Sequence, residues 1–308
     1  MNSRFLPVPD GLSGQRADLA ISRMLGIPRA QVAALIDAQQ ILIDNRPILR
    51  SQRLKVTDIL DITLPEEKPP GQEPTPVEGM EIVYDDADIV VVNKPVGVAA
   101  HTGPGWSGPT VVGALRAAGY RVSTSGPPER EGIVHRLDVG TSGLMAVAKS
   151  ELAYSRLKNA FRRREVTKIY HTLVQGHVDP PVGTIEAPIG RHPSKEFKMG
   201  IVEGGKHAVT HYDLLELMPG ASLLEVNLET GRTHQIRVHM SAIHHPCIAD
   251  PLYGADLQLA ERLGLERQWL HAVGLRFEHP ITGVGLELRS EYPADLLSAL
   301  ESMRNGLA

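Results

Sequence analysis

Apolar and polar residues follow two rhythms along this chain of 308 residues, one with the period of a helix and one with the period of a strand. Behind Ser150, a residue type that caps helices, Ala153, Leu157, Ala160 and Phe161 recur at helical spacing. The unbroken apolar run 144–148 predicts a buried strand instead. The same reasoning predicts a hairpin at 82–92, helices at 110–119 and after Pro293, and strands at 166–175, 208–217 and 221–229.

Residues 1–65 read as a compact unit of their own. A helix from Arg29 to about Ala38, opened by Pro28, precedes short strands at 41–43 and 60–64. Residues 66–79 are rich in proline and charge without apolar periodicity, and they predict a linker. In residues 80–308, strands and helices do not alternate as βαβ units. The sequence therefore predicts an α+β domain with a mainly antiparallel mixed sheet, joined to a small N-terminal α/β domain.

Composition narrows the class of protein without deciding its activity. The single cysteine, Cys247, excludes an internal disulfide and favours a cytoplasmic protein. No apolar run is long enough to span a membrane, and the first seven residues lack the apolar core of a signal peptide. A net charge of −4 argues weakly against a nucleic-acid binder, but local basic faces matter more than the total charge.

The most informative segment is 135–144, His-Arg-Leu-Asp-Val-Gly-Thr-Ser-Gly-Leu. It places Asp138 after the basic pair His135-Arg136 and before a turn that leads into the apolar run. An acid at such a junction, next to cations, can stay ionised and accessible to a substrate. Taken in isolation, an aspartate before Gly-Thr-Ser is more often a residue that caps a turn.

Further segments in the same order make the chain resemble the RluA family of RNA pseudouridine synthases. Besides the block around Asp138, the resemblance rests on Val92-Asn93-Lys94-Pro95-Val96-Gly97, Lys168-Ile169-Tyr170, the stretch 231–240 with Arg237, Asp250-Pro251-Leu252-Tyr253-Gly254, Leu270-His271-Ala272 and Phe277-Glu278-His279-Pro280. Because these segments are spread over most of the chain, the resemblance extends well beyond one motif.

The resemblance implies that the protein isomerises uridine in RNA, a reaction that needs no redox cofactor because no group is oxidised or donated. Asp138 would act at the sugar as nucleophile or base. Arg237 would keep Asp138 ionised and oriented. The residues themselves predict a helix capped by Thr233, with Arg237 in its first turn. Tyr170 would lie against the uracil or move its C5 proton. Arg136 would fill the space that the flipped-out uridine leaves.

Two sets of basic residues are candidates for RNA phosphates. Residues 1–65 resemble the S-four RNA-binding domain, although Gln40 and Asp44-Asn45 stand where its pattern has glycines, so the turns need not be the same. Its candidates are Arg16, Arg23, Arg29, Arg50 and Arg53. Candidates in the larger domain are Arg162, Arg163, Arg164 and Lys168. Without the resemblance, both sets would be read as solvated helix faces.

An S-four domain is common in the branch of the family that modifies 23S large-subunit ribosomal RNA, which favours that substrate. We expect the enzyme to be a monomer. Two alternatives stay open: a tRNA pseudouridine synthase of the same family, and a non-catalytic RNA-binding factor for ribosome assembly. A nucleotide hydrolase on the loop 200–207 is disfavoured, because His207 stands where a phosphate-binding loop needs Ser or Thr. A metal site is not expected, because His239, His244, His245 and Cys247 lack paired ligand spacing.

Overall fold

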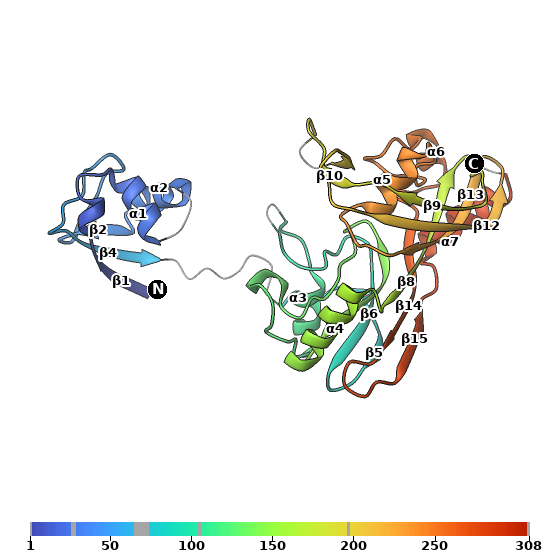
Figure 1. The fold of residues 1–308 in the computed structure, drawn as a ribbon, viewed down its shortest axis with the longest axis horizontal. Helices are drawn as coiled ribbons and strands as arrows, with labels where there is room; N and C mark the ends of the chain where they lie inside the picture. The colour runs from blue at the N-terminus through green and yellow to red at the C-terminus, as the bar shows by residue number, and fades with distance from the viewer. Residues whose placement is uncertain (1, 26–28, 65–73, 104–105, 196–197, 307–308) are drawn as a thin grey trace. The chain divides into compact units, whose positions relative to one another are not determined.

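The computed structural model describes residues 2–25, 29–64, 74–103, 106–195 and 198–306 (Figure 1). The chain divides into two compact units, Met1–Lys68 and Pro69–Ala308. Most of the predicted linker and Pro28, the predicted start of a helix, lie outside the described residues. In the part of the chain that the structure describes, no helix combines the length and apolarity that a membrane crossing requires.

The N-terminal unit is a four-stranded antiparallel sheet with two helices. The strand order is β1 (Asn2–Pro7), β4 (Ile59–Leu64), β2 (Ile41–Ile43) and β3 (Arg46–Pro47). Helices α1 (Ala17–Leu25) and α2 (Arg29–Asp37) bury apolar side chains against this sheet, among them Ile21 and Val32. The predicted helix after Arg29 and the strands at 41–43 and 60–64 are therefore present.

The turn between β2 and β3 forms without glycine. Asp44 and Asn45 both have left-handed backbone conformations, with φ of 50° and 61°. A two-residue hairpin turn of this type needs positive φ at both positions, and Asp and Asn tolerate it better than other residues with a side chain. Asp44-Asn45 can therefore form the turn where glycine was expected.

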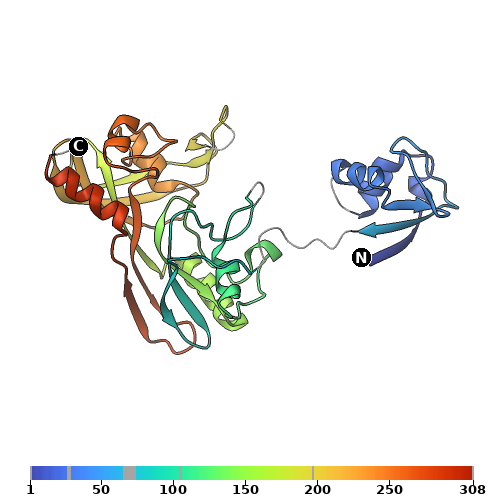
Figure 2. The same ribbon diagram turned by 180° about the vertical axis from the view of Figure 1, so that it is seen from behind.

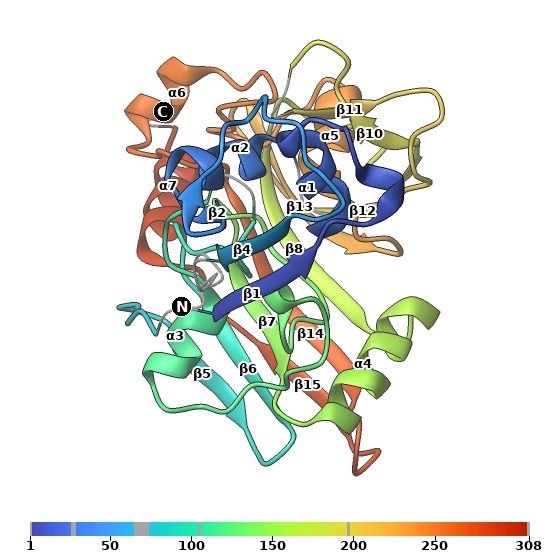
Figure 3. The ribbon, with the colours of Figure 1, turned by 90° about the vertical axis from the view of Figure 1, so that its left-hand side faces the viewer.

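The larger unit is built on one twisted sheet of nine strands (Figure 3). Its order is β5 (Glu81–Asp85), β6 (Ile89–Lys94), β7 (Ser142–Ala148), β14 (Leu270–Glu278), β8 (Thr167–Gln175), β13 (Ala221–Leu228), β12 (Val209–Met218) and β9 (Val182–Glu186), with β15 (Gly285–Arg289) also paired to β14. Among the described strands of this sheet, the pairing of β7 with β14 is parallel and the others are antiparallel. The prediction of a mainly antiparallel α+β domain is confirmed, as are the strands predicted at 166–175, 208–217 and 221–229.

Helices cover both faces of this sheet where β6 and β7 lie. On one face, Val90 and Val92 share a core with α3 (Val111–Ala117). On the other face, Ile89 and Val91 share a core with α4 (Glu151–Arg163), whose first turn is capped by the Ser150 side chain as predicted. Since both faces are covered, every residue of β7 is buried, which explains its unbroken apolar sequence.

Farther along the sheet, α7 (Ala294–Arg304) and α6 (Leu257–Arg262) pack on β8 and β13 (Figure 2). The Trp269 indole, fully buried, donates a hydrogen bond of 2.8 Å to the Leu296 carbonyl and so ties α7 to the start of β14. Helix α5 (Gln235–Ala242) follows β13, and a separate hairpin of β10 (Ile189–Arg191) and β11 (Met199–Ile201) precedes β12. Two short 3-10 helices, Asp10–Leu12 and Pro128–Arg130, complete the described elements.

Candidate active site

Asp138 lies in the turn that leads into β7. The Thr141 amide donates a 3.0 Å hydrogen bond to the Asp138 carbonyl and closes the turn. Immediately afterwards Gly143 has a φ of +117°, and a Cβ there would lie 2.4 Å from the Ala272 carbonyl oxygen. Only glycine lets β7 approach β14 this closely. The glycine of the motif therefore fixes where the strand that follows Asp138 enters the sheet.

Arg237 faces the Asp138 carboxylate from the first turn of α5. Its Nη1 lies 3.4 Å from Asp138 Oδ2, while its Nε and Nη2 donate to the two oxygens of Asp250 at 2.6 and 2.9 Å. Arg237 and Asp250 are both almost fully buried, whereas the Asp138 side chain is 15% exposed. The guanidinium is therefore clamped by Asp250 and presents its remaining edge to Asp138.

The entrance to α5 differs from the prediction that Thr233 caps this helix. The residue at the cap position is His234, in a left-handed conformation with φ of 58° and without a side-chain capping bond. The buried Gln235 side chain organises the entrance instead: its Oε1 accepts from Thr230 Oγ1 and the Arg232 amide, and its Nε2 donates to the Val209 carbonyl. Because Gln235 already ties the helix start to β12, no threonine cap is needed.

His234 and Tyr253 complete the surroundings of Asp138. Tyr253 Oη accepts a bond from the Met199 amide, so its hydroxyl proton is free to bond His234 Nδ1, 2.8 Å away. Burial lowers the pKa of His234, which favours the neutral ring with its proton on Nε2. That nitrogen lies 3.9 Å from Asp138 Oδ2. The motif 250–254 was recognised in the sequence, but nothing there assigned Asp250 or Tyr253 a place at the site.

Tyr170 lies on β8, opposite Val226 of β13, with only 6% of its surface exposed. Burial and the negative charge of Asp138 both raise the pKa of its hydroxyl. The phenol is therefore protonated in the free protein at neutral pH. Tyr170 lines the pocket with a protonated hydroxyl, which fits both predicted roles, contact with a base and transfer of a proton.

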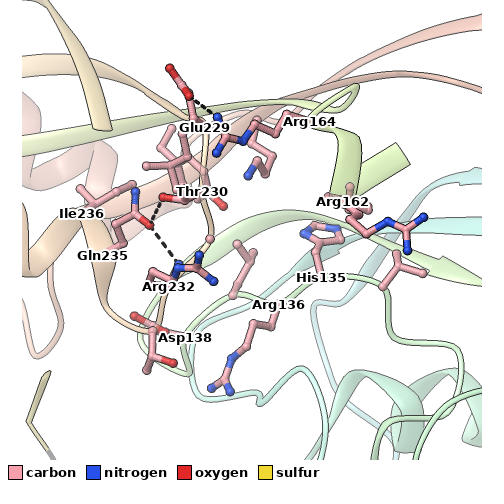
Figure 4. A pocket seen from close by; sticks show the side chains of 18 of the residues that line it. His135, Arg136, Asp138, Arg162, Arg164, Glu229, Thr230, Arg232, Gln235 and Ile236 are labelled. Atoms are coloured by element: carbon pink, nitrogen blue, oxygen red, sulfur yellow. Dashed lines mark hydrogen bonds and ion pairs between the residues drawn. The ribbon is translucent and has the colours of Figure 1, made fainter. Parts of the chain in front are cut away.

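Asp138, Tyr170, His234 and Arg237 line a pocket of about 870 Å³. Figure 4 shows this pocket with Asp138 labelled. Its walls come from the loop before β7, from α4, from β8 and from the segment between β13 and α5. The predicted catalytic, base-flipping and RNA-binding residues that line it are Arg136, Asp138, Arg162, Arg164, Lys168, Tyr170 and Arg237. Arg163 is not among the lining residues; it is exposed and lies 3.8 Å from Glu165.

His135 anchors the loop that carries Arg136 and Asp138. The Ala146 amide of β7 donates to His135 Nε2 at 2.9 Å, and the ring stacks on Phe161 of α4 with centroids 4.6 Å apart. Burial, with a smaller contribution from the charge of Lys168, lowers the pKa of His135 to about 3. The ring is therefore neutral, which identifies it as a structural support. Arg136, the next residue, is exposed on the pocket.

The pocket wall on the α4 side is basic but contains one paired acid. Arg164 ends α4 in a left-handed conformation, and its Nη1 lies 2.6 Å from Glu229 Oε2 (Figure 4). Burial and the charge of Arg164 lower the pKa of Lys168 to about 8. Such a wall suits a polyanion, with Arg164 already held in place by Glu229.

The arginines predicted to bind RNA in the N-terminal unit are exposed, and each has a partner within that unit. Arg16 and Arg29 both bond Asp18, whose pKa falls to about 2 chiefly through the Arg16 bond. The other pairs are Arg23 with Gln15 Oε1, Arg50 with Asp37, and Arg53 with the Gly14 carbonyl. These five side chains belong to the other unit and are not part of the pocket.

Two features weighed in the sequence have no active-site geometry. The segment 200–207 leads from β11 into β12, with a strand where a phosphate-binding loop requires a helix. Cys247 is fully buried, and burial raises the pKa of its thiol to about 12, so it is not a ready nucleophile. Within the described residues, no three His, Cys, Asp or Glu side chains group as metal ligands.

The model of the RNA pseudouridylate synthase family matches residues 88–242, which include the Asp138 turn, Tyr170 and Arg237. A relative from Mycobacterium bovis, described as an uncharacterized RNA pseudouridine synthase, is 56% identical over 99% of both chains. The chain belongs to the RluA family of RNA pseudouridine synthases. It is therefore an isomerase that modifies RNA.

Other relatives of this pseudouridine synthase include the ribosomal large subunit pseudouridine synthase D of Escherichia coli K12, which is 37% identical over 96% of this chain and 93% of the relative. Among solved structures, human RNA pseudouridylate synthase domain containing 1 matches with a TM-score of 0.57 and 32% identity, covering 72% of this chain and 86% of the human one. Human RNA pseudouridylate synthase domain containing 4 matches with a TM-score of 0.56 and 25% identity, covering 73% and 93%. These matches bear out the predicted family and the fold of the larger unit.

Proposed function

We propose that this synthase converts uridines of 23S large-subunit ribosomal RNA to pseudouridine, with Asp138 as the catalytic carboxylate. The choice of RNA is supported by the similarity to the E. coli large-subunit enzyme along 96% of the chain. The observation that carries the mechanism is the geometry of Asp138: a partly exposed carboxylate at a pocket, 3.4 Å from a clamped arginine.

The reaction needs an acid–base pair and a closed pocket, and no external reactant. The bond between N1 and C1′ breaks, the uracil turns, C5 bonds to C1′, and the C5 proton is replaced by one on N1. We propose that Asp138 acts at the ribose, either as a nucleophile on C1′ or as a base on a neighbouring proton. Arg237 keeps its carboxylate ionised. Tyr170 contacts the uracil and takes part in the transfer of its C5 proton. The freed uracil stays within the pocket between these groups.

The uridine has to leave its stack to reach Asp138, which costs a few kcal/mol. Arg136 lies two residues before Asp138 and is exposed on the pocket. In this proposal it would occupy the space that the base vacates. Arg162, Arg164 and Lys168 would contact flanking phosphates from the α4 side. Arg163 also lies at this end of α4, outside the pocket, and would contact RNA only beyond it.

The N-terminal unit is proposed to be an S-four RNA-binding domain, with Arg16, Arg23, Arg29, Arg50 and Arg53 as its phosphate contacts. Their exposure supports this role. Arg23, Arg50 and Arg53 make exposed bonds, so exchanging those partners for a phosphate would cost little. Arg16 and Arg29 would contact a phosphate while keeping their bonds to the buried Asp18. We further propose that the protein works as a monomer in the cytoplasm, where its ribosomal RNA substrate would be found.

The decisive experiment replaces Asp138 with Asn, which keeps the shape and removes the charge. We expect release of tritium from C5-labelled uridine RNA to fall below detection while RNA binding and the thermal unfolding midpoint stay close to wild type. Asp256→Asn is the matched control, because Asp256 is an exposed cap of α6 and Asn caps as well as Asp. Retained turnover by the Asp138→Asn protein would refute the assigned mechanism.

The substrate is tested separately by mapping pseudouridine in a deletion strain. Loss of sites in 23S ribosomal RNA, restored by the wild-type gene and not by Asp138→Asn, is the expected result. Loss confined to tRNA would refute the ribosomal assignment. Full complementation by Asp138→Asn, without any isomerised uridine, would instead identify a non-catalytic assembly factor.

A further inference from the structure

The turn after Asp138 is held from within the protein by two buried basic side chains. Lys94 is fully buried, and its Nζ donates to the carbonyls of Pro95 and Val98 at 2.9 and 2.8 Å and lies 3.5 Å from that of Val139. The Gly97 amide also donates to the Val139 carbonyl, at 3.0 Å. The peptide between Val139 and Gly140 is therefore held by bonds from Lys94 at the end of β6 and from Gly97 in the loop that follows it.

The second basic side chain is that of Arg267, which reaches the same turn from the chain before β14. Its Nη1 lies 3.1 Å from Ser142 Oγ and 3.5 Å from the Gly140 carbonyl. The Arg267 residue is 6% exposed, so these contacts are shielded from water. An arginine suits this place because its planar fork can serve several acceptors at once.

Side chains next to Arg267 hold the rest of the turn. Gln268 Nε2 donates to Thr141 Oγ1 at 3.1 Å, and a Cβ at Gly140 would lie 2.7 Å from the Gln268 amide oxygen. Ser142 Oγ also lies 2.8 Å from His271 Nδ1 on β14. Every residue from 139 to 142 thus has a polar contact with Lys94, Arg267, Gln268 or His271.

Arg267 is itself fixed by the C-terminal helix. Its Nε and Nη2 donate to the two carboxylate oxygens of Asp295, in the first turn of α7, at 2.7 and 2.9 Å. Burial opposes ionisation of Asp295, but the hydrogen bonds from Arg267 lower its pKa overall. This bidentate pair leaves Nη1 of Arg267 for the turn, as the Asp250 pair leaves Nη1 of Arg237 for Asp138.

We propose that the Arg267–Asp295 pair positions the catalytic turn, so that α7 contributes to the rate of isomerisation through the placement of Asp138. Both are positioning residues, because neither lines the pocket. The inference rests on the proposed role of Asp138. Displacement of a reacting group by about 1 Å can cost 10²-fold in rate, so the loss of this support should reduce kcat even in a folded protein.

The test compares Asp295→Asn, Arg267→Lys, Arg267→Gln and the double variant Arg267→Gln/Asp295→Asn. We expect kcat for saturating RNA to fall roughly 10- to 100-fold with KM within about threefold of wild type, since binding surfaces are untouched. Arg267→Lys should retain more activity than Arg267→Gln, because it keeps the charge but not the fork. The double variant should be no slower than Arg267→Gln alone, because both changes break one unit.

Arg304→Gln is the matched control on the same helix. Arg304 forms an exposed ion pair with Glu216, 2.7 Å apart, far along α7 from Asp295. Its loss should leave kcat unchanged. Rates are normalised to the fraction of protein that binds RNA stoichiometrically. If Arg267→Gln does not fold, Asp295→Asn decides, because its side chain is 38% exposed and the substitution keeps its shape.

Three outcomes distinguish the possibilities. Wild-type kcat in both Asp295→Asn and a folded Arg267 variant, with Asp138→Asn inactive, overturns the positioning role and leaves the proposed function intact. An equal fall of kcat in Arg304→Gln also overturns it, because general loosening of α7 would then explain the effect. Activity in Asp138→Asn would overturn the proposed function itself.

Discussion

Arg237 Nη1 lies 3.4 Å from Asp138 Oδ2, a longer contact than either of the two bonds that the same guanidinium makes to Asp250. Both oxygens of the Asp250 carboxylate accept from Arg237, and Oδ1 also accepts from the amides of Leu252 and Tyr253. Asp138 is the looser and more exposed partner. One buried cation thus serves two acids with different tasks: Asp250 fixes Arg237, and Asp138 remains free to meet the substrate.

Asp250→Asn should therefore damage both stability and catalysis. Removing the charge of one partner in a buried ion pair costs about 3–5 kcal/mol, so we expect the free energy of unfolding to fall by that order. Turnover per folded molecule should also fall, because Arg237 is no longer clamped toward Asp138. Chemical denaturation and tritium release measure the two effects. Stability and turnover equal to those of the Asp256→Asn control would contradict this account.

Tyr170→Phe separates the two roles proposed for Tyr170. The ring and its burial are kept, so RNA affinity should change by less than about threefold, while loss of a proton-transfer group typically costs 10²–10⁴-fold in rate. Tyr170→Leu removes the ring as well and should weaken binding in addition. Single-turnover tritium release and RNA titration report these quantities. A fully active Tyr170→Phe enzyme would restrict Tyr170 to contact with the base.

The elements around the site were predictable because their signals are local. Ser150 before an apolar stripe identifies α4, and the run 144–148 identifies β7, since such patterns are properties of a few adjacent residues. The wrong prediction, Thr233 as the cap of α5, has a tertiary cause. Gln235 bonds β12, from a distant part of the sequence, and this holds His234 in a conformation that few residues with a side chain adopt.

Contacts between remote segments could not be predicted from the sequence, because they too depend on the tertiary structure. Nothing in the spacing shows that Asp250 would clamp Arg237, or that Asp295 would hold Arg267 beneath the turn at 138–142. Lys94 illustrates the point further. Its motif was recognised, but only the fold makes clear that it is buried, with a pKa lowered by burial to about 7, bonding backbone carbonyls. Motifs locate candidate residues, and tertiary packing assigns their partners.

Lys168 should give RNA binding a pH dependence. Its pKa is lowered to about 8 by burial and by the charge of Arg164, and the ammonium is present below that pH and lost above it. We expect affinity to fall as the pH rises from 7 to 9. At pH 9 the slope of log K against log salt should be smaller by about 0.7–0.9, the change for one phosphate contact. An arginine at position 168 stays charged over this range, so the RNA affinity of Lys168→Arg should not decrease in this way between pH 7 and 9.

The control for this prediction is Arg163→Gln, which removes an exposed charge outside the pocket. It should lower affinity less than Lys168→Gln and leave the pH profile of the wild type unchanged. Filter binding at pH 7, 8 and 9 with one short RNA suffices for the comparison. If the affinity of Lys168→Arg falls with pH as that of the wild type does, another group is responsible.

The last prediction concerns how the two units divide the work. The apolar core of Pro69–Ala308, including both faces of the large sheet, is built from residues of that unit alone. The N-terminal unit Met1–Lys68 is therefore not needed for the packing of this core. Removing residues 1–68 should weaken RNA binding and flatten its salt dependence, because phosphate contacts are lost. At saturating concentrations of a short stem-loop the truncated enzyme should turn over at close to the wild-type rate, since Asp138, Tyr170 and Arg237 remain. Linkage of two modest binders raises affinity without touching the chemical step. A truncated protein that folds and binds normally but cannot isomerise saturating RNA would show that the N-terminal unit takes part in catalysis.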